Sequence, residues 1–441
     1  MWNEVASGNL ISQRQKNLAR PCNDYNAILK RIGQARSSRL EINKIPQLTF
    51  INLVTEPWDS PWLSRQGLMS CLSRKHRVIF VLKEPALDSL LGMFGNGQFP
   101  RARILKINES IYELQPGPLQ PKIYFSPWLD KVSRQLRFRK IRQLVNGLGW
   151  GNPILYVWNP HFQDVVGRAD EILSVFHIHD HYPSFDKFGT EERAQAERDY
   201  AKLIRDVDLV FACSETLLKT VQEIRYENVY HIENGVEYAR FSAARLMKQG
   251  TPRELASLPR PIIGNIGRID SRVDIELMTE LAKQRPGWTM LLLGPKVGTV
   301  SKFEAALEVF RALPNAVYVE GKSVTALPTY VNSLDVGLLC YKTEGTWMPY
   351  GSPLKMFEYF AVGKPAVCTY ISSLEKYEPV LRMARTRDAW IPLIEDALQE
   401  NSSEAVQRRI AIAESNSWER RAEIILDTIA RHPKFLPGLK A

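Results

Sequence analysis

Cysteine is scarce in this chain, with five residues among 441 and no CxxC pair. This scatter argues against a disulfide framework or a zinc site, and it predicts free thiols in a reducing compartment. No window holds 18 consecutive apolar residues, so a membrane-spanning helix is not expected. The N-terminus lacks the charged start and apolar core of a signal peptide, which predicts a cytoplasmic location.

Acidic residues are outnumbered, with 48 Asp and Glu against 58 Lys and Arg, for a net charge of +10 at pH 7. Such an excess suits nucleic acid, an anionic membrane or a phosphorylated ligand. No RNA- or DNA-binding motif is present, so nucleic acid is not expected as a partner. Apolar residues make up 44% and charged residues 24%, as in globular proteins, and the length allows two domains.

Short apolar runs typical of strands alternate with helical segments in two successive series. This alternation predicts an α/β protein with two Rossmann-like, doubly wound domains that face each other across a cleft. We interpret residues 241–261, which show no strong pattern, as a linker. The expected division is a basic extension (1–46), a first domain (47–245), a second domain (255–385) and C-terminal helices (386–441).

The segment 350–365, YGSPLKMFEYFAVGKP, reads as the start of a helix built to hold an anion. Ser352 is expected as the N-cap, Lys355 falls in the first turn, and Gly363 can end the helix. A helix N-terminus beside a lysine binds phosphate, and Glu358 one turn deeper could accept hydrogen bonds from ribose hydroxyls. A capped surface helix with a Lys–Glu pair explains the same residues, and the local pattern leaves both readings open.

The order and spacing of several motifs resemble the nucleotide-sugar domain of glycosyltransferases with the GT-B fold. The first half looks like their acceptor domain in three stretches, HIHDHYPSF, VDLVFACSETL and VYHIENGVEYARF. The nearest likeness is to bacterial enzymes of surface-polysaccharide synthesis, of the family 1/4 type. SWERRAEIIL resembles the closing helices of this fold, the last of which packs back on the first domain. The second-half motifs are GNIGRID (264–270), LLLGP (291–295), residues 313–341 and SPLKMFEYFAVGKPAV (352–367).

The resemblance implies roles for individual residues. Lys355 and Arg268 would neutralise the donor diphosphate, with Ser352 and Arg272 as further contacts, and Glu358 would hold the ribose. The segment Gly321, Lys322 and Ser323 would flank the nucleobase. Many retaining members carry another glutamate eight residues before the ribose-binding one, and Tyr350 stands there in this chain. That departure weakens the case for a retaining mechanism.

The segment that contains Asp180 ends a predicted strand, where this architecture places chemistry. Asp180 is our candidate catalytic base, because an inverting transfer needs a carboxylate to take the proton of the acceptor hydroxyl. It could instead cap the next turn. His179 and His181 flank it and could tune its pKa or bind the acceptor. We disfavour a metal reading of the alternating histidines, which include His177.

Asp206-Val-Asp208 matches the DxD triplet of metal-dependent glycosyltransferases. It lies where a helix passes into a strand, which favours a structural role. The expected phosphate ligands are cationic side chains and a helix N-terminus. We therefore expect no cofactor and no required metal.

Residues 131–150 form a basic segment with a partial apolar stripe and no acidic residue. A basic amphipathic helix can lie on an anionic membrane, which would suit an acceptor carried on a lipid at the inner membrane face. A solvated helix packed on its own domain is an equal alternative. Trp58 and Arg65, in the loop after the first strand, are candidates for acceptor binding, or for the core.

We therefore predict a glycosyltransferase (a hexosyltransferase) that moves a sugar from a nucleotide-diphosphate sugar to a hydroxyl of a glycan or lipid-linked glycan in polysaccharide synthesis. Two alternatives stay open, namely a nucleotide-sugar epimerase of the same fold and a non-catalytic binding relative. A dehydrogenase is disfavoured, because GNIGR (264–268) lacks the third glycine of the dinucleotide fingerprint.

Overall fold

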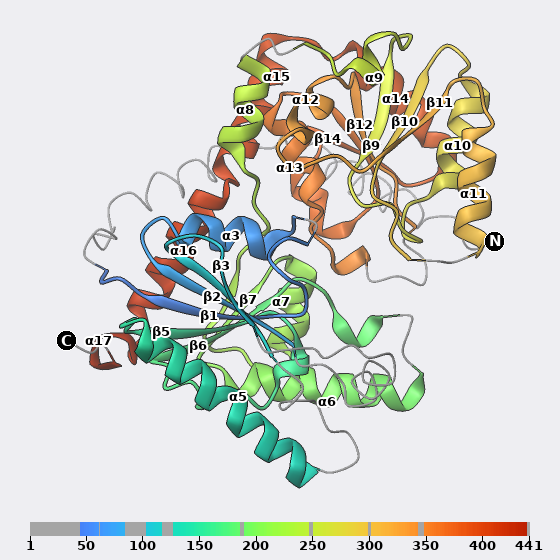
Figure 1. The fold of residues 1–441 in the computed structure, drawn as a ribbon. Coiled ribbons are helices and arrows are strands. Elements are labelled where there is room, and N and C mark those ends of the chain that lie inside the picture. Colours follow the sequence, from blue (N-terminus) through green and yellow to red (C-terminus); the bar gives the residue numbers. More distant parts are fainter. Residues whose placement is uncertain are drawn as a thin grey trace, which may run out of the picture. The chain divides into compact units, whose positions relative to one another are not determined.

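The computed structural model describes residues 45–438, apart from residue 61 and segments 84–102, 117–126, 186–188, 247–249, 299–300 and 343–347. Nearly all of the predicted extension 1–46 lies outside the described residues. Two largely parallel sheets with intervening helices confirm the predicted α/β class (Figure 1).

The first sheet has eight strands in the order β3-β4-β2-β1-β5-β6-β7-β8. All neighbours are parallel except β3 and β4, which form an antiparallel edge that the sequence pattern did not predict. The central strands are buried at nearly every position, as is usual when helices cover a parallel sheet. The strands are β1 (Thr49–Val54), β2 (Arg77–Leu82), β3 (Arg103–Lys106), β4 (Ile111–Gln115), β5 (Pro153–Val157), β6 (Leu173–Ile178), β7 (Leu209–Ala212) and β8 (Val229–His231).

Helices connect most of these strands, and β1 and β2 are parallel with α3 between them. The α helices are α3 (Ser64–Leu72), α5 (Pro127–Gly147), α6 (Thr190–Asp206) and α7 (Glu215–Gln222), and the 3-10 turns are η2 (Pro160–Phe162) and η3 (Tyr182–Ser184).

The second sheet has six strands, all parallel, in the order β11-β10-β9-β12-β13-β14. Alternate residues of β10 point to opposite faces: Leu291 and Leu293 join one core, and Met290 and Leu292 join the other. The strand order reverses direction between β9 and β12, where doubly wound sheets bind ligands. The strands are β9 (Ile262–Ile266), β10 (Thr289–Gly294), β11 (Ala316–Glu320), β12 (Val336–Leu339), β13 (Ala366–Thr369) and β14 (Leu381–Ala384).

Helices cover both faces of this sheet, with α10 and α11 on the side of one core (Figure 1). The α helices are α10 (Ile275–Gln284), α11 (Ser301–Arg311), α12 (Leu327–Asn332), α13 (Leu354–Ala361) and α14 (Trp390–Gln399), and the 3-10 turns are η4 (Met348–Tyr350), η5 (Ser372–Tyr377) and η6 (Arg387–Ala389).

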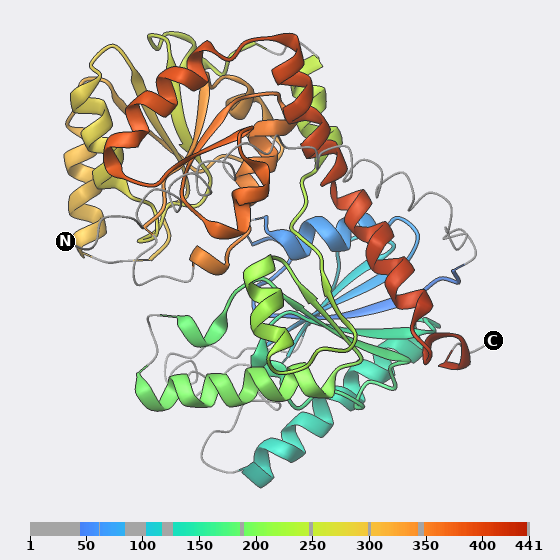
Figure 2. The same ribbon diagram turned by 180° about the vertical axis from the view of Figure 1, so that it is seen from behind.

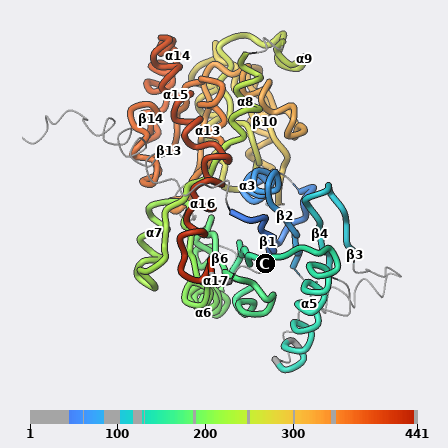
Figure 3. Tube along the Cα trace, turned by 90° about the vertical axis from the view of Figure 1, so that its left-hand side faces the viewer, coloured from blue at the N-terminus to red at the C-terminus, as the bar shows by residue number. Residues whose placement is uncertain are grey.

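The predicted linker at 241–261 is wrong. It holds most of α8 (Tyr238–Leu246) and all of α9 (Arg253–Ala256). Phe241 and Leu255 are buried in the same core as Ile262 of β9, and α8 packs beside α13 (Figure 3). Only Phe241, Ala244 and Leu255 of these short helices are buried, so packing rather than periodicity decides their structure.

The chain closes with α15 (Ser403–Ser415), α16 (Trp418–Arg431) and the short α17 (Phe435–Gly438). Helix α16 packs on α3 of the first sheet, as its course in Figure 2 shows. A Cβ at Gly67 of α3 would lie 2.3 Å from the indole nitrogen of Trp418, so a glycine is needed at this contact. No helix in the described part of the chain is long and apolar enough to cross a bilayer.

Candidate active site

The predicted anion-binding helix exists but begins later than expected. Pro353, in an extended conformation, is the N-cap of α13, so Ser352 is not the cap. The Ser352 hydroxyl is buried without a partner, and its carbonyl accepts a hydrogen bond from Asn234 Nδ2 at 2.6 Å. Gly363 ends the helix with a φ of 78°, as predicted. Because Ser352 does not cap the helix, its buried hydroxyl stays unpaired beside the first turn of α13 and is available to a ligand.

Lys355 lies in the first turn of α13 and is buried. Its ammonium donates to Asn265 Oδ1 and lies 5.2 Å from the centre of the Tyr341 ring. Burial lowers the pKa of Lys355 to about 8, and Arg272 also lowers it. No ion pair joins Lys355 to Glu358 among the described residues. The surface-pair reading therefore does not hold, and the lysine lacks a full counter-charge.

Glu358 lies one turn after Lys355 and is half-buried. Burial raises the pKa of Glu358 to about 7, against the opposing charge of Lys355. In the described part of the chain, no side chain donates a hydrogen bond to this carboxyl group. A carboxyl group that is partly desolvated and short of donors is suited to accept hydrogen bonds from ligand hydroxyls.

Asp270 positions the two arginines predicted to bind phosphate. Arg272 Nε donates to Asp270 Oδ1 at 2.8 Å, and Arg268 Nε lies 3.3 Å from Oδ2. Burial alone would raise the pKa of Asp270, but hydrogen bonds and charge from Arg272 lower it below its usual value. The Arg268 side chain stays 45% exposed and accessible to a ligand.

Two glycines bring the ends of β9 and β10 very close together. A Cβ at Gly294 would lie 1.8 Å from the carbonyl oxygen of Gly267, and Gly294 has a φ of 154°. A Cβ at Gly267, with a φ of 129°, would lie 2.8 Å from Cε of Lys355. Any larger residue would therefore displace the backbone or the lysine at the sheet edge.

The predicted nucleobase segment follows β11. A Cβ at Gly321 would lie 2.9 Å from Pro295, so the segment runs against the loop after β10. Lys322 is occupied by an ion pair with Glu254 at 2.7 Å, and Ser323 is hydrogen-bonded to Thr325. The structure thus gives Lys322 a partner from a distant segment, which the sequence pattern did not reveal.

Asp180 follows β6 of the first sheet and is half-buried. Burial raises its pKa to about 6, although the positive charges of Arg272 and Arg65 oppose the shift. In turn, burial alone would lower the pKa of Arg272, and the negative charge of Asp180 is among those that raise it. The structure thus places the candidate base within electrostatic range of a predicted phosphate-binding arginine, although they are 92 positions apart in the sequence.

The neighbouring histidines have different surroundings. His179 stacks on Trp158, with ring centroids 4.6 Å apart, and on His177 at 4.5 Å. Burial lowers the pKa of His179 well below its usual value, so the ring is neutral at pH 7. His181 instead stacks on Tyr350, at 4.5 Å. The histidines are thus divided between two stacks.

Trp58 lies in the loop after β1, as predicted, whereas Arg65 lies in the first turn of α3, and both have partners of their own. The Trp58 ring packs edge-on against Phe80, with centroids 4.9 Å apart, and its backbone N–H donates to Glu113. Arg65 forms an ion pair with Glu56, yet its Nε is buried without a hydrogen-bond partner. Trp58 thus joins the domain's packing, whereas Arg65 keeps a donor to offer.

The DxD-like triplet is engaged in structural contacts. Asp206 forms an ion pair with Lys202, and Asp208 accepts hydrogen bonds from the backbone and hydroxyl of Ser174. Asp208 also forms an ion pair with Lys434 at 2.5 Å. Across the described residues, no group of three or more His, Cys, Asp or Glu side chains is arranged to hold a metal ion.

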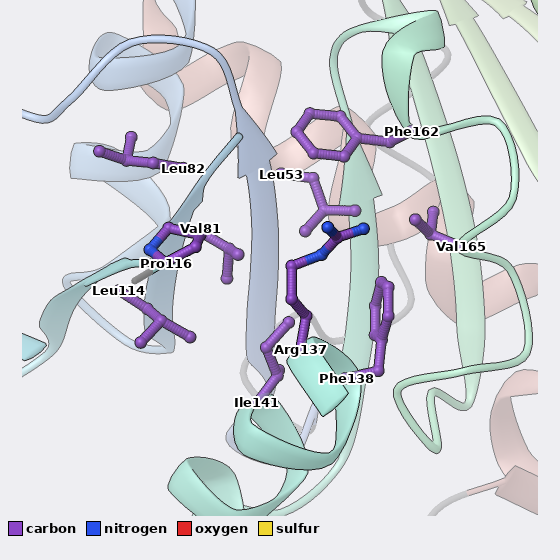
Figure 4. Close-up of a pocket in the computed structure, with 10 residues that line it drawn as sticks. All are labelled: Leu53, Val81, Leu82, Leu114, Pro116, Arg137, Phe138, Ile141, Phe162 and Val165. Atoms are coloured by element: carbon purple, nitrogen blue, oxygen red, sulfur yellow. The ribbon is translucent and has the colours of Figure 1, made fainter. Parts of the chain in front are cut away.

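Residues 131–147 of the basic segment lie in α5, so most of the segment is helical. Phe138 and Ile141 of α5 pack with strands β1, β2 and β4 around a cavity of only about 20 Å³, too small for a ligand (Figure 4). Arg134 forms an ion pair with Asp164 at 2.8 Å. The helix therefore packs on its own domain. Exposed apolar residues nevertheless remain on its first half, namely Trp128, Leu129, Val132 and Leu136.

Sequence reasoning missed several residues that shape the site. Asn265 and Tyr341 surround the Lys355 ammonium, and Asn234 joins the start of α13 to the loop after β8. Asn265 lies at the end of a predicted strand inside the GNIGR motif, so its position was a usable signal. Tyr341 and Asn234 are distant in sequence, and only the folded chain brings them close.

Comparison with known proteins agrees with this architecture. The chain aligns structurally with an α,α-trehalose-phosphate synthase (UDP-forming) from Burkholderia xenovorans in complex with glucose-6-phosphate. That alignment has a TM-score of 0.63 at 10% identity and covers 87% of this chain and 99% of the synthase. It also aligns with Anabaena HepE in complex with UDP and glucose. The TM-score is 0.61 at 14% identity, over 87% of this chain and 100% of HepE. The chain has the GT-B fold.

A sequence relative extends the comparison. The sequence matches no family model. It is 32% identical over 184 residues to TuaH of Bacillus subtilis (strain 168), whose name describes a teichuronic acid biosynthesis glycosyltransferase. That match covers 40% of this chain and 44% of TuaH, so the chain spans less than half the length of this relative.

Proposed function

We propose that this GT-B protein is a glycosyltransferase that moves a sugar from a nucleotide-diphosphate sugar to a hydroxyl of a glycan or lipid-linked glycan. The observation that carries the proposal is the buried, incompletely neutralised Lys355 in the first turn of α13. A lysine at a helix N-terminus is suited to a phosphate group, and a diphosphate would supply the missing negative charge.

The donor would bind at the carboxyl edge of the second sheet. Lys355 and Arg268 would contact the diphosphate, with Arg272 and the unpaired Ser352 hydroxyl as further contacts. Glu358 would accept hydrogen bonds from the ribose. The nucleobase would lie against the segment Gly321, Lys322 and Ser323. The UDP in the HepE structure supports a nucleotide-sugar donor for this fold.

The transfer step would use Asp180 as general base. The acceptor hydroxyl attacks the anomeric carbon and gives its proton to the Asp180 carboxylate, while the bond from that carbon to the diphosphate oxygen breaks. A pKa of about 6 leaves Asp180 mostly ionised at pH 7 and able to accept the proton. Lys355 and Arg268 would stabilise the departing nucleoside diphosphate, and such donors contribute about 3 kcal/mol each. These cations make a metal unnecessary in the proposal.

The acceptor would bind near Asp180 on the first sheet. The neutral, stacked His179 and the buried, unpaired Nε of Arg65 are its proposed contacts. Both ring nitrogens of His179 are buried without a partner, whereas Nδ1 of His181 is already hydrogen-bonded to the Ser184 hydroxyl and the Trp58 ring is packed against Phe80, so His181 and Trp58 have weaker cases. The name of TuaH supports a role in surface-polysaccharide synthesis.

A lipid-linked acceptor would place the enzyme at the cytoplasmic face of a membrane, through α5. The exposed apolar residues of α5 include Trp128 and Leu136, and the exposed Lys131 and Arg139 lie among them. This combination supports contact with an anionic bilayer by the first half of the helix. Cosedimentation with phosphatidylglycerol vesicles but not phosphatidylcholine vesicles is expected. Equal cosedimentation of wild type and Leu136→Ser would contradict the contact.

Product analysis tests the enzyme assignment. The protein is incubated with UDP-, GDP-, ADP- and dTDP-sugars, with and without lipid-linked glycan acceptors and with excess EDTA. We expect nucleoside diphosphate release that depends on one acceptor and survives EDTA. A new sugar nucleotide without acceptor would identify an epimerase instead. If a donor binds but is not turned over with any of the acceptors, the protein would be a non-catalytic relative.

A further inference from the structure

A charged cavity lies in the second domain, away from the proposed donor site. Its volume is about 680 Å³, which falls within the roughly 300–1,000 Å³ of small-molecule sites. Its lining includes residues just before β9, β12 and β13, at the amino-terminal edge of the sheet. The donor residues follow the opposite ends of the same strands, about 16 Å away across the five residues of β9.

Positive charge dominates this cavity. Four cations line it, namely Arg245, Arg260, Lys364 and Arg409, against the single carboxylate of Asp335. They come from four separate segments. Helices α8, α12, α13 and α15 pack side by side around it, as the tube in Figure 3 shows for α8, α13 and α15.

Two of these cations already have partners. Arg260 Nη1 holds Asp335 at 2.7 and 2.8 Å, and Arg260 Nη2 donates to the carbonyl of Ser333 after α12. Arg409 pairs with Glu400 and donates to the carbonyl of Gly363 after α13. These arginines satisfy carbonyls at helix C-termini, so their presence needs no ligand.

The other two cations are not explained in this way. The Nε of Arg245 is buried without a hydrogen-bond partner. No described residue forms an ion pair or a hydrogen bond with the Lys364 ammonium. Burial lowers the pKa of Lys364, and the charges of Arg260 and Arg409 lower it too, while Asp335 alone opposes them. An anion beside Lys364 and Arg245 would relieve this imbalance.

We propose that this cavity binds a phosphate-bearing small molecule through Lys364 and Arg245, independently of the donor site. Its size and charge suit a sugar phosphate or a free di- or triphosphate. The two sources share the same chemistry, namely a compact group with several negative oxygens. The inference does not rest on the glycosyltransferase proposal, because none of its residues belongs to that site.

Chemical labelling of lysines tests the site in the intact protein, with inorganic pyrophosphate as the probe. A bound anion would raise the pKa of Lys364 and cover its amine, so the rate of its acylation, followed by peptide mass spectrometry, is expected to fall several-fold. The exposed Lys283 is the internal control and should not change. UDP should protect Lys355 and leave Lys364 unprotected, which separates the two sites.

A matched pair of variants locates the contact. Arg245→Gln should weaken the pyrophosphate protection of Lys364 about tenfold, the effect of losing one charged hydrogen bond. Arg253→Gln, on the exposed surface of α9, should not. Protection of Lys364 by sodium chloride at equal ionic strength would show screening alone and overturn the proposal. Unchanged labelling of Lys364 in the presence of pyrophosphate, or equal effects of the two variants on its protection, would also overturn the proposal.

Discussion

The ring of Tyr350 lies almost flat on the ring of His181, with centroids 4.5 Å apart and an interplanar angle of 19°. The Tyr350 carbonyl also accepts a hydrogen bond from Ser214 Oγ at 2.7 Å. Tyr350 stands where many retaining relatives carry a glutamate, and here it joins the start of α13 to the loops after β6 and β7. The position thus serves packing beside the candidate base.

Removing that ring should loosen the contact. Tyr350→Ala is expected to lower the free energy of unfolding by about 1–3 kcal/mol, because it loses a stacked pair and buried area. Tyr350→Phe keeps the stacked ring and should remain within about 0.5 kcal/mol of wild type. Urea denaturation measures both. Equal losses in the two variants would show that the stack contributes nothing.

The base assignment predicts a loss of rate without a loss of donor affinity. Asp180→Asn should lower kcat by about 10²–10⁴-fold, the usual contribution of a general base, with the donor Kd nearly unchanged. The wild-type rate should fall as the pH drops below about 6, where the carboxylate becomes protonated. Asp170→Asn is the control, since Asp170 is exposed and its carboxylate forms an ion pair with Arg142, outside the proposed site. A wild-type rate in Asp180→Asn would place the base elsewhere.

Glu358 should make stability depend on pH. Its folded pKa of about 7 exceeds the ordinary 4.5, so the folded state favours the protonated carboxyl group. Its stabilising contribution is then complete below pH 4.5 and is lost as the pH rises through 7. Glu358→Gln, which stays neutral, should be more stable than wild type at pH 8, by up to about 3 kcal/mol at 1.36 kcal/mol per pKa unit.

The difference between Glu358→Gln and wild type should vanish near pH 4. Thermal unfolding across this range measures it in the protein without nucleotide. A difference that is constant with pH would mean that Glu358 ionises normally in the folded protein.

The glycine contact at the sheet edge predicts a specific sensitivity. Gly294→Ala should destabilise the fold by several kcal/mol and abolish nucleotide binding, because its Cβ would lie 1.8 Å from the Gly267 carbonyl oxygen. Gly287→Ala is the matched control, since no atom lies within 4 Å of its added Cβ. Circular dichroism melting and nucleotide titration report the two effects. A Gly294→Ala protein with wild-type binding would exclude the glycine contact from the site.

The sequence allowed prediction of the α/β architecture and of the helix that carries Lys355 and Glu358, whereas the binding roles of these residues stay predictions. Apolar strand runs and the spacing of Lys355, Glu358 and Gly363 are local signals, and the fold keeps them. The start of α13 was misplaced by one residue, because Pro353 takes an extended conformation that periodicity does not reveal. The helices at 238–256 were missed, because their buried residues are few and their stability comes from packing.

Contacts between distant segments could not be predicted from sequence alone. Nothing in the loop after β6 indicates that Asp180 meets the charge of Arg272, or that His181 meets Tyr350. The sequence suggested that Lys322 is available to a nucleobase, whereas in the structure its ammonium forms an ion pair with Glu254. Such contacts depend on how loops at strand ends converge, and one sequence carries no direct record of this.

Isothermal titration of UDP, GDP, ADP and dTDP into three proteins tests the central claim most directly. The proteins are wild type, Lys355→Ala and Lys342→Ala, the last at a half-exposed lysine paired with Glu276. We predict that one nucleoside diphosphate binds wild type and Lys342→Ala alike and binds Lys355→Ala at least tenfold more weakly, as expected for a lost charged hydrogen bond. Unchanged affinity in Lys355→Ala, or no binding of any nucleotide to wild type, would contradict a donor site at the start of α13.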